Sequence, residues 1–361
     1  MAAHRIVVRS IGTATAAVPT ALAEALPFAP ERLARCLYQA PAVLLDGLAE
    51  DQARTIGGLL ADTGLEIEVA EAGEPVEEGG PELELAVHVG EPARFRAVAA
   101  ELARFLGCRV SRAVSLLCAR PPVVLGRVSA ATAEALRARL EPLGAEVDAS
   151  RTATARYDVY VDPDARELRH RLARLLEDAG AEVVAEGPLV ALGIPRAAAE
   201  TLWARVGADA RWQMLDQAFQ RLDVVLEQPA HGAEAMAAIV EVSGMPPALV
   251  ERVCASAPVV LCDAVPAARA TAALSRLAAA GVEAAAPLVT LESWDVVVHA
   301  ADDPRAAAEV IASVLDVEAG PVALALRRPP ARVGTPVGLT RGRWLLHELS
   351  AVGARAVLEN R

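Results

Sequence analysis

Aromatic side chains and arginines gather in one part of this chain. Of its eleven aromatic residues, five lie between residues 157 and 219. They are Tyr157, Tyr160, Trp203, Trp212 and Phe219. Aromatic rings beside guanidinium groups are common at the centres of protein interfaces. We therefore predict a peptide-binding site at Tyr157, Tyr160, Arg211 and Trp212, whereas the helical spacing of Trp203 predicts a core position. The alternative is a core that is repacked with larger side chains.

Catalytic and metal-binding groups are sparse by comparison. His299 precedes Asp302 and Asp303, and these groups suit metal binding or acid–base chemistry, but acidic capping of a helix explains them more simply. The sequence has no phosphate-binding glycine loop, no nucleophile elbow and no spaced set of metal ligands. We therefore expect no enzyme activity, no cofactor and no metal, with an unfamiliar enzyme site in the aromatic stretch as a remaining alternative.

The cysteines indicate a reducing compartment. There are five of them, at positions 36, 108, 118, 254 and 262, and none forms a CxxC pair. An odd number without paired spacing argues against a disulfide framework and against a zinc ribbon. The apolar segment 11–26 follows Arg5 and Arg9 as a signal peptide would, but Pro19 and the threonines favour a strand and helix instead. We expect a cytoplasmic protein.

Charge and hydropathy exclude two classes of partner. The chain has 361 residues, a net charge of -12 and 54% hydrophobic residues, and every basic residue is arginine. An acidic balance disfavours binding to the phosphate backbone of nucleic acids. No apolar run approaches the roughly 18 residues of a transmembrane helix. We therefore expect neither nucleic acid nor membrane as a partner.

A block that starts at a proline and ends at a glycine recurs five times. The blocks run over 41–64, 122–144, 258–281 and 330–353, with a weaker copy over 188–207. The proline-to-glycine distance is 23, 22, 23 and 23 residues in the good copies and 19 in the weak one. Each proline leads an apolar strand, and an alanine- and arginine-rich helix then ends at the glycine, which takes a left-handed conformation at little cost. The residue four before the glycine is leucine in the good copies and Trp203 in the weak one, which predicts a core-facing stripe.

Each block is preceded by a further strand and helices. The opening strands are predicted at 4–8, 83–89, 157–161, 222–226 and 294–299. We therefore predict an α+β fold, a tandem array of about five small β-α-α-β-α-β domains, each a three-stranded antiparallel sheet covered by helices. The third copy is degenerate, with one long helix over 165–179. The predicted repeats cover 1–71, 82–150, 156–218, 222–290 and 293–361, and 72–81 is an acidic linker rich in glycine and proline.

The order of elements resembles the C-terminal domain of the bacterial ribosomal stalk protein and the similar ClpS adaptor. The fourth copy carries the resemblance best, in Ile239–Val253, in the Ala257–Pro258 strand entry and in Leu277–Glu283. These segments are similar to the stalk domain's "VTGLGLKEAKDLV", its "AP" strand entry and its "LEEAGAKVEV" ending. The copies together cover nearly the whole chain. The stalk family, however, presents lysines on its helix-turn-helix surface, where this chain has Ser111, Arg112, Pro247 and Ala248.

The resemblance implies a rigid small domain that binds protein segments and catalyses no reaction. We therefore predict a non-catalytic peptide- or protein-binding adaptor, with precursor-peptide binding in a ribosomal-peptide pathway as one setting. A short segment would lie along a strand edge or in a groove. The alternative is a structural protein that self-associates through its repeats. The sequence leaves the oligomeric state open.

Overall fold

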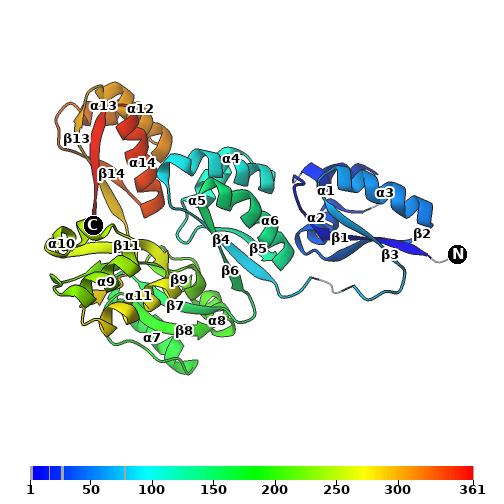
Figure 1. Cartoon of the computed structure of the whole chain (residues 1–361), viewed down its shortest axis with the longest axis horizontal. Helices are drawn as coiled ribbons and strands as arrows, with labels where there is room; N and C mark the ends of the chain where they lie inside the picture. The colour runs from blue at the N-terminus through cyan, green and yellow to red at the C-terminus, as the bar shows by residue number, and fades with distance from the viewer. Residues whose placement is uncertain (1–2, 16, 26–27, 77–78, 361) are drawn as a thin grey trace. The chain divides into compact units, whose positions relative to one another are not determined.

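The computed structural model describes residues 3–15, 17–25, 28–76 and 79–360. Within these residues the chain forms five separate three-stranded antiparallel sheets, each with its own helices (Figure 1). This confirms the predicted α+β array of small domains. The chain divides into two compact units, Met1–Thr154 and Ala155–Arg361. The residue boundaries predicted for the repeats stay predictions, and positions 77–78 of the predicted linker lie outside the described residues.

The first unit contains repeats 1 and 2. Repeat 1 comprises β1 (His4–Ser10), α1 (Ala17–Ala25), α2 (Pro30–Tyr38), β2 (Ala42–Leu48), α3 (Glu50–Asp62) and β3 (Glu66–Glu71). Repeat 2 comprises β4 (Leu83–Val89), the short 3-10 helix η1 (Pro92–Arg94), α4 (Phe95–Leu106), α5 (Val110–Leu117), β5 (Val123–Val128), α6 (Ala130–Leu140), η2 (Glu141–Leu143) and β6 (Ala145–Arg151).

The second unit contains repeats 3, 4 and 5. Repeat 3 comprises β7 (Arg156–Val161), α7 (Arg166–Asp178), β8 (Leu189–Pro195), α8 (Arg196–Val206) and β9 (Trp212–Asp216), and the 3-10 helix η3 (Gln217–Phe219) follows. Repeat 4 comprises β10 (Arg221–Leu226), α9 (Ala233–Ser243), α10 (Pro247–Cys254), β11 (Val259–Pro266), α11 (Ala267–Ala279) and β12 (Ala284–Ala285). Repeat 5 comprises β13 (Trp294–Ala301), α12 (Pro304–Leu315), α13 (Ala319–Ala325), β14 (Ala331–Val337), α14 (Leu339–Ala351) and β15 (Ala354–Asn360).

All five sheets have one topology. The first strand of each repeat lies in the middle and pairs antiparallel with the second and third strands, as in the order β2-β1-β3. The strand register pairs Val7 with Val43 in repeat 1 and Ala86 with Val123 in repeat 2. Pro121 is therefore the equivalent of Pro41, so the proline-to-glycine block of repeat 2 begins one residue earlier than the predicted start at Pro122.

A bulge in the second strand recurs with a specific partner. The register shifts at this point, and the bulged residue has a positive φ at Gly47, Arg127, Gly193 and Ala264. Bulges of this kind leave one backbone N–H outside the strand ladder. In repeats 3 and 4 a first-strand carboxylate accepts that N–H. Gly193 N donates to Asp158 Oδ1 at 2.8 Å, and Ala264 N donates to Asp223 Oδ1 at 2.7 Å.

Repeat 2 docks on repeat 1 through helix α6. Arg139 on α6 donates from Nη2 to the carbonyl oxygens of Gly12 and Ala14, both at 2.7 Å. Thr132 Oγ1 donates to the carbonyl of Tyr38 at 2.8 Å, and the Tyr38 hydroxyl donates to the carbonyl of Phe105 at 3.1 Å. Burial is the main cause that lowers the pKa of Arg139. These contacts join the two repeats of the first unit.

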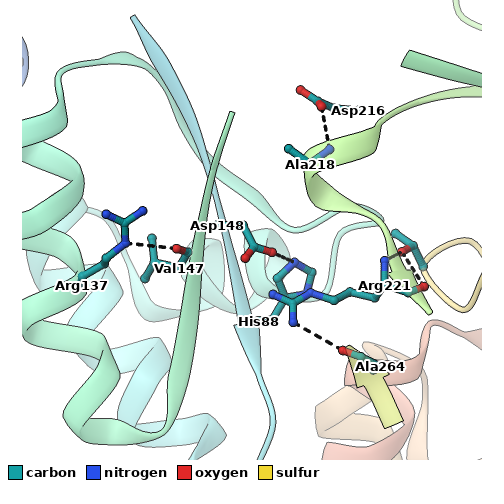
Figure 2. A network of polar contacts seen from close by, with 9 residues as sticks. His88, Arg137, Val147, Asp148, Asp216, Ala218, Arg221 and Ala264 are labelled. Atoms are coloured by element: carbon teal, nitrogen blue, oxygen red, sulfur yellow. Dashed lines mark hydrogen bonds and ion pairs between the residues drawn. The ribbon is translucent and has the colours of Figure 1, made fainter. Parts of the chain in front are cut away.

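Polar contacts also cross the strands inside individual repeats (Figure 2). In repeat 2, His88 Nε2 on β4 lies 3.2 Å from Asp148 Oδ2 on β6. In repeat 4, Arg221 Nη1 on β10 donates to the carbonyl of Ala264 on β11 at 3.4 Å. Each of these contacts ties neighbouring strands of one sheet together, so we interpret these side chains as parts of the scaffold.

Candidate functional site

The four residues of the sequence-predicted site do not form one surface. Tyr157 packs against the core of repeat 3, which also contains Trp212. Tyr160 lies three residues on, and alternation along the strand puts it on the opposite face of the sheet. Arg211 is exposed, but its guanidinium is already paired with Asp209, Nη2 to Oδ2 at 2.7 Å and Nε to Oδ1 at 3.0 Å. The structure therefore divides the predicted site between the core, the opposite sheet face and an exposed ion pair.

The pKa values of Tyr160 and of Asp209, the partner of Arg211, are shifted by their local surroundings. Burial, followed by the nearby Asp158 carboxylate, raises the pKa of Tyr160. The side-chain hydrogen bond from Arg211 lowers the pKa of Asp209 to about 2. Both pKa shifts have causes within repeat 3 itself. Neither shift is therefore evidence of a ligand-binding site.

The predicted roles of the two tryptophans in repeat 3 are reversed. Trp212 is 3% exposed and donates from Nε1 to the carbonyl of Gly207 at 3.1 Å, whereas Trp203 is 49% exposed. The rings still touch, with centroids 5.5 Å apart. The reversal follows from the segment after Gly207, because β9 starts only at Trp212, five residues on, and Trp212 fills the core. Leu202, 3% exposed, takes the core position predicted for Trp203.

The other chemically suggestive residues have structural roles. Asp303 caps α12, accepting from the backbone N–H of Arg305 at 2.9 Å and of Ala306 at 3.1 Å. No group of three or more histidine, cysteine or acidic residues among the described residues is arranged to hold a metal ion. The five cysteines are free thiols. Burial raises the pKa of both Cys254 and Cys262, which makes them less reactive.

An open apolar hollow lies between α9 and α10 of repeat 4. It has a volume of about 540 Å³ and is bounded by one set of residues from each helix. They are Met236, Ala237, Val240, Glu241, Pro247, Val250 and Glu251. Val250 is buried, Met236 and Val240 are half-buried, and all three contact the core of the repeat. Smaller hollows lie between α7 and α8, with about 230 Å³, and between α13 and β14, with about 200 Å³.

The local sequence of repeat 4 explains why its helix pair is open. In repeats 2, 4 and 5 the first helix of the pair ends at a residue with a left-handed backbone, which aligns the three helices. These residues are Gly107, Gly244 and Asp316. Eight and four residues earlier, repeat 4 has Met236 and Val240, whereas repeat 2 has Ala99 and Ala103 and repeat 5 has Ala308 and Ala312.

Small side chains let paired helices approach closely, and larger ones hold them apart. The alanines of repeats 2 and 5 therefore suit close packing of the pair, while methionine and valine suit an open groove in repeat 4. Methionine is also flexible and polarisable, so it adapts to differently shaped apolar partners.

The edge of the hollow is acidic. Both ionisable residues that line it are glutamates, Glu241 on α9 and Glu251 on α10. Glu241 Oε2 pairs with Arg276 Nε of α11 at 2.6 Å, and the Glu251 side chain is exposed. An apolar floor with carboxylates at its rim suits noncovalent binding of an apolar group.

Sequence reasoning missed this hollow although one signal was present. Aligning the repeats on the residue that ends the first helix shows Met236 and Val240 against alanine in two other repeats. The sequence-based prediction favoured repeat 3, because that repeat departs further from the common pattern.

Helices α9 and α10 are also apolar enough to raise the question of membrane insertion. Within the described part of the chain, no single helix is both long enough and apolar enough to cross a bilayer. The α9–α10 pair meets that length and composition only when both helices are counted together, and it is bent by 109°.

Comparison of the chain with protein-family models, with curated proteins and with solved structures gives no match. The resemblance to the ribosomal stalk domain and to ClpS therefore stays a prediction.

Proposed function

We propose that this protein is a non-catalytic binding protein that docks a segment of another protein in the hollow between α9 and α10. The observation that carries the proposal is the open, methionine-containing apolar surface in repeat 4, at positions where two other repeats have alanine. Grooves between paired helices receive apolar side chains of a partner in one common mode of protein recognition. The other repeats serve as scaffold.

The setting that we propose is an accessory protein that holds a precursor peptide for modifying enzymes. Support for this setting comes only from the resemblance to adaptor domains, together with an acidic chain in which we find no catalytic motif. The partner would then be encoded close to the gene of this protein, which makes a defined set of peptides available for testing.

Methionine methyl groups provide a direct test on the intact chain. The chain has four methionines, and Met236 lines the hollow while Met214 packs against the core of repeat 3. We expect a bound peptide to move the methyl resonance of Met236 in a carbon-13 spectrum and to leave that of Met214 in place. Peptides from proteins encoded by neighbouring genes are the ligands to titrate. If none of them moves the Met236 resonance up to millimolar concentration, the proposal is wrong.

A matched pair of variants localises the binding. Ala237→Trp places a large ring among the residues that line the hollow, whereas Ala248→Trp adds the same ring to an exposed position of α10 outside that lining. We expect the first variant to lose peptide binding and the second to retain it. Equal binding by both variants would place the site elsewhere.

Self-association through the repeats is the second candidate function. Large apolar side chains are exposed away from the hollow, including Leu59 on α3, 64% exposed, and Leu324 on α13, 68% exposed. Scattered apolar residues are ordinary on protein surfaces, so this observation favours assembly only weakly. Light scattering over a range of protein concentrations distinguishes the two functions, because an assembling protein grows in mass and an adaptor stays small.

A further inference from the structure

The rim of the α9–α10 hollow carries information about the charge of its occupant. Glu241 and Glu251 come from the two different helices that form the walls. The charge of Glu241 is offset by its ion pair with Arg276, whereas Glu251 on the other wall is exposed. Carboxylates at the edge of an apolar groove attract a cationic partner and repel an acidic one. This inference rests on the proposed binding function of the same hollow.

The two glutamates occur together only in the repeat that has the open hollow, among the three repeats compared. Repeat 2 has Arg104 and Val114 at the equivalent positions, and repeat 5 has Ser313 and Ala323. The fold itself therefore needs no carboxylate at either place. The open apolar floor and the acidic rim occur together in repeat 4. A site for a segment with apolar and cationic side chains requires both features.

Helix α11 shows how a guanidinium is held at this rim. Arg276 Nε lies 2.6 Å from Glu241 Oε2, and both side chains remain partly accessible to solvent. Glu251, on the opposite wall, is exposed and lines the hollow. An arginine or lysine of a partner can approach Glu251 in the same way, without displacing Arg276.

We propose that the hollow binds an amphipathic protein segment that inserts a bulky apolar side chain between α9 and α10 and pairs a neighbouring arginine or lysine with Glu251. The apolar side chain supplies most of the binding free energy, because the floor formed by Met236, Val240 and Val250 is removed from water. The charge pair lies at the rim, so it contributes mainly to partner selection and to the association rate.

Three designed peptides test the chemistry of the occupant on the full-length protein. Each is an amphipathic peptide of about 15 residues, a length at which helices become marginally stable in water. The first has leucines on one face flanked by arginines, the second has glutamate at every arginine position, and the third has serine at every leucine position. We expect only the first to bind at the hollow, seen as movement of the Met236 methyl resonance, with an affinity that falls as salt is added.

Charge variants separate binding at this rim from general attraction to an acidic protein. Glu251→Gln should weaken binding of the arginine peptide by about two- to fivefold, the range expected for one exposed ion pair. Glu283→Gln removes an exposed carboxylate of the same repeat outside the hollow and should leave the affinity unchanged. Equal effects of the two substitutions would overturn the inference.

The outcomes distinguish this inference from the proposed function beneath it. If the glutamate peptide moves the Met236 resonance as strongly as the arginine peptide, the hollow binds segments but the cationic preference is wrong. If peptides from the natural partner move the Met236 resonance but no designed peptide does, the inference that the hollow binds a cationic apolar segment is also wrong. If no peptide of any kind moves the Met236 resonance, both the proposed function and the cationic preference are wrong.

Discussion

Asp223 illustrates how one residue serves the fold at an electrostatic cost. Its carboxylate on β10 accepts the N–H of the bulged residue Ala264 at 2.7 Å. Burial is the main cause that raises the pKa of Asp223, and the charge of Asp263 adds to it, while the hydrogen bond from Ala264 and the charge of Arg343 oppose it. The ionised form of Asp223 is therefore less favourable in the folded protein than in the unfolded chain.

The substitution Asp223→Asn should stabilise the protein at neutral pH. Asparagine keeps an oxygen that accepts from Ala264 and removes the half-buried charge, so we expect the melting temperature at pH 7 to 8 to rise by about 1–3 °C. A carboxyl whose pKa is raised on folding destabilises the folded state when ionised, and this cost disappears as pH falls through the raised pKa toward 3.8. The advantage of the variant should therefore shrink steadily between pH 7 and pH 4.

Asp46 provides the matched control for this prediction. It is exposed, and it accepts the N–H of the bulged residue Gly47 at 2.7 Å. Asp46→Asn keeps that hydrogen bond without relieving a buried charge, so the melting temperature should hardly change. A pH-independent gain in both variants would show that burial of the Asp223 charge is not the cause.

The two contacting tryptophans of repeat 3 should differ strongly in their contribution to stability. Trp212→Ala removes a buried ring from the core and should cost about 3–5 kcal/mol. Trp203→Ala removes an exposed ring and mainly its contact with Trp212, for about 0.5–1.5 kcal/mol. Urea denaturation followed by far-UV ellipticity compares the two losses through the transition in which the second unit unfolds. Similar losses would contradict the assignment of Trp212 to the core and Trp203 to the surface.

At the level of helices, the glycines that follow the last helix of each repeat are not equivalent. Gly64 has φ of +92°, and a Cβ there would lie 2.8 Å from Ala14 N and 2.9 Å from Thr13 C. Gly281 occupies the same place in repeat 4, with φ of +70° and no atom within 4 Å of an added Cβ. Backbone conformation is unfavourable for alanine at both positions, but only Gly64 also faces a backbone clash.

We therefore expect Gly64→Ala to be the more damaging of the two substitutions. Gly281→Ala should cost about 1–2 kcal/mol, the cost of a left-handed backbone at a non-glycine residue. Gly64→Ala adds overpacking against the loop after β1 and should cost about 3 kcal/mol or more. Melting curves of the two variants provide the comparison, and equal losses would show that the loop at Thr13 and Ala14 yields easily.

Helical spacing predicted core residues correctly in most repeats, because those repeats share a core-facing position four residues before the closing glycine. The leucines four residues before the closing glycine are buried in repeats 1, 2, 4 and 5. These residues are Leu60, Leu140, Leu277 and Leu349. In repeat 3 the same spacing chose Trp203 wrongly, because the longer segment after Gly207 changes which side chains reach the core. Connections between elements are set by tertiary packing, which spacing within one helix does not report.

The candidate site was harder to predict than the fold for a related reason. Strands and helices follow from periodicity within a segment, whereas the α9–α10 hollow depends on how far two helices stand apart. That separation reflects the sizes of Met236 and Val240 relative to the alanines of other repeats. Only alignment of the repeats on Gly244 and its equivalents makes this contrast visible in the sequence.

For the molecule as a whole, the division into two compact units implies more than one cooperative unfolding step. Repeats 1 and 2 belong to Met1–Thr154, and repeats 3, 4 and 5 belong to Ala155–Arg361. Each unit buries its own apolar residues, and proteins composed of several units commonly violate two-state behaviour. The tryptophans are placed to report this, because all four, at positions 203, 212, 294 and 344, lie in the second unit.

Tryptophan fluorescence and far-UV ellipticity should therefore give different unfolding midpoints in urea, since the first reports only the second unit and the second reports helices in both. Gly64→Ala, which destabilises the first unit, should move the ellipticity curve and leave the fluorescence midpoint in place. Leu202→Ala opens a cavity in repeat 3, where Leu202 is 3% exposed, and should move the fluorescence midpoint to lower urea. Coincident curves that move together in both variants would contradict separate unfolding of the two units.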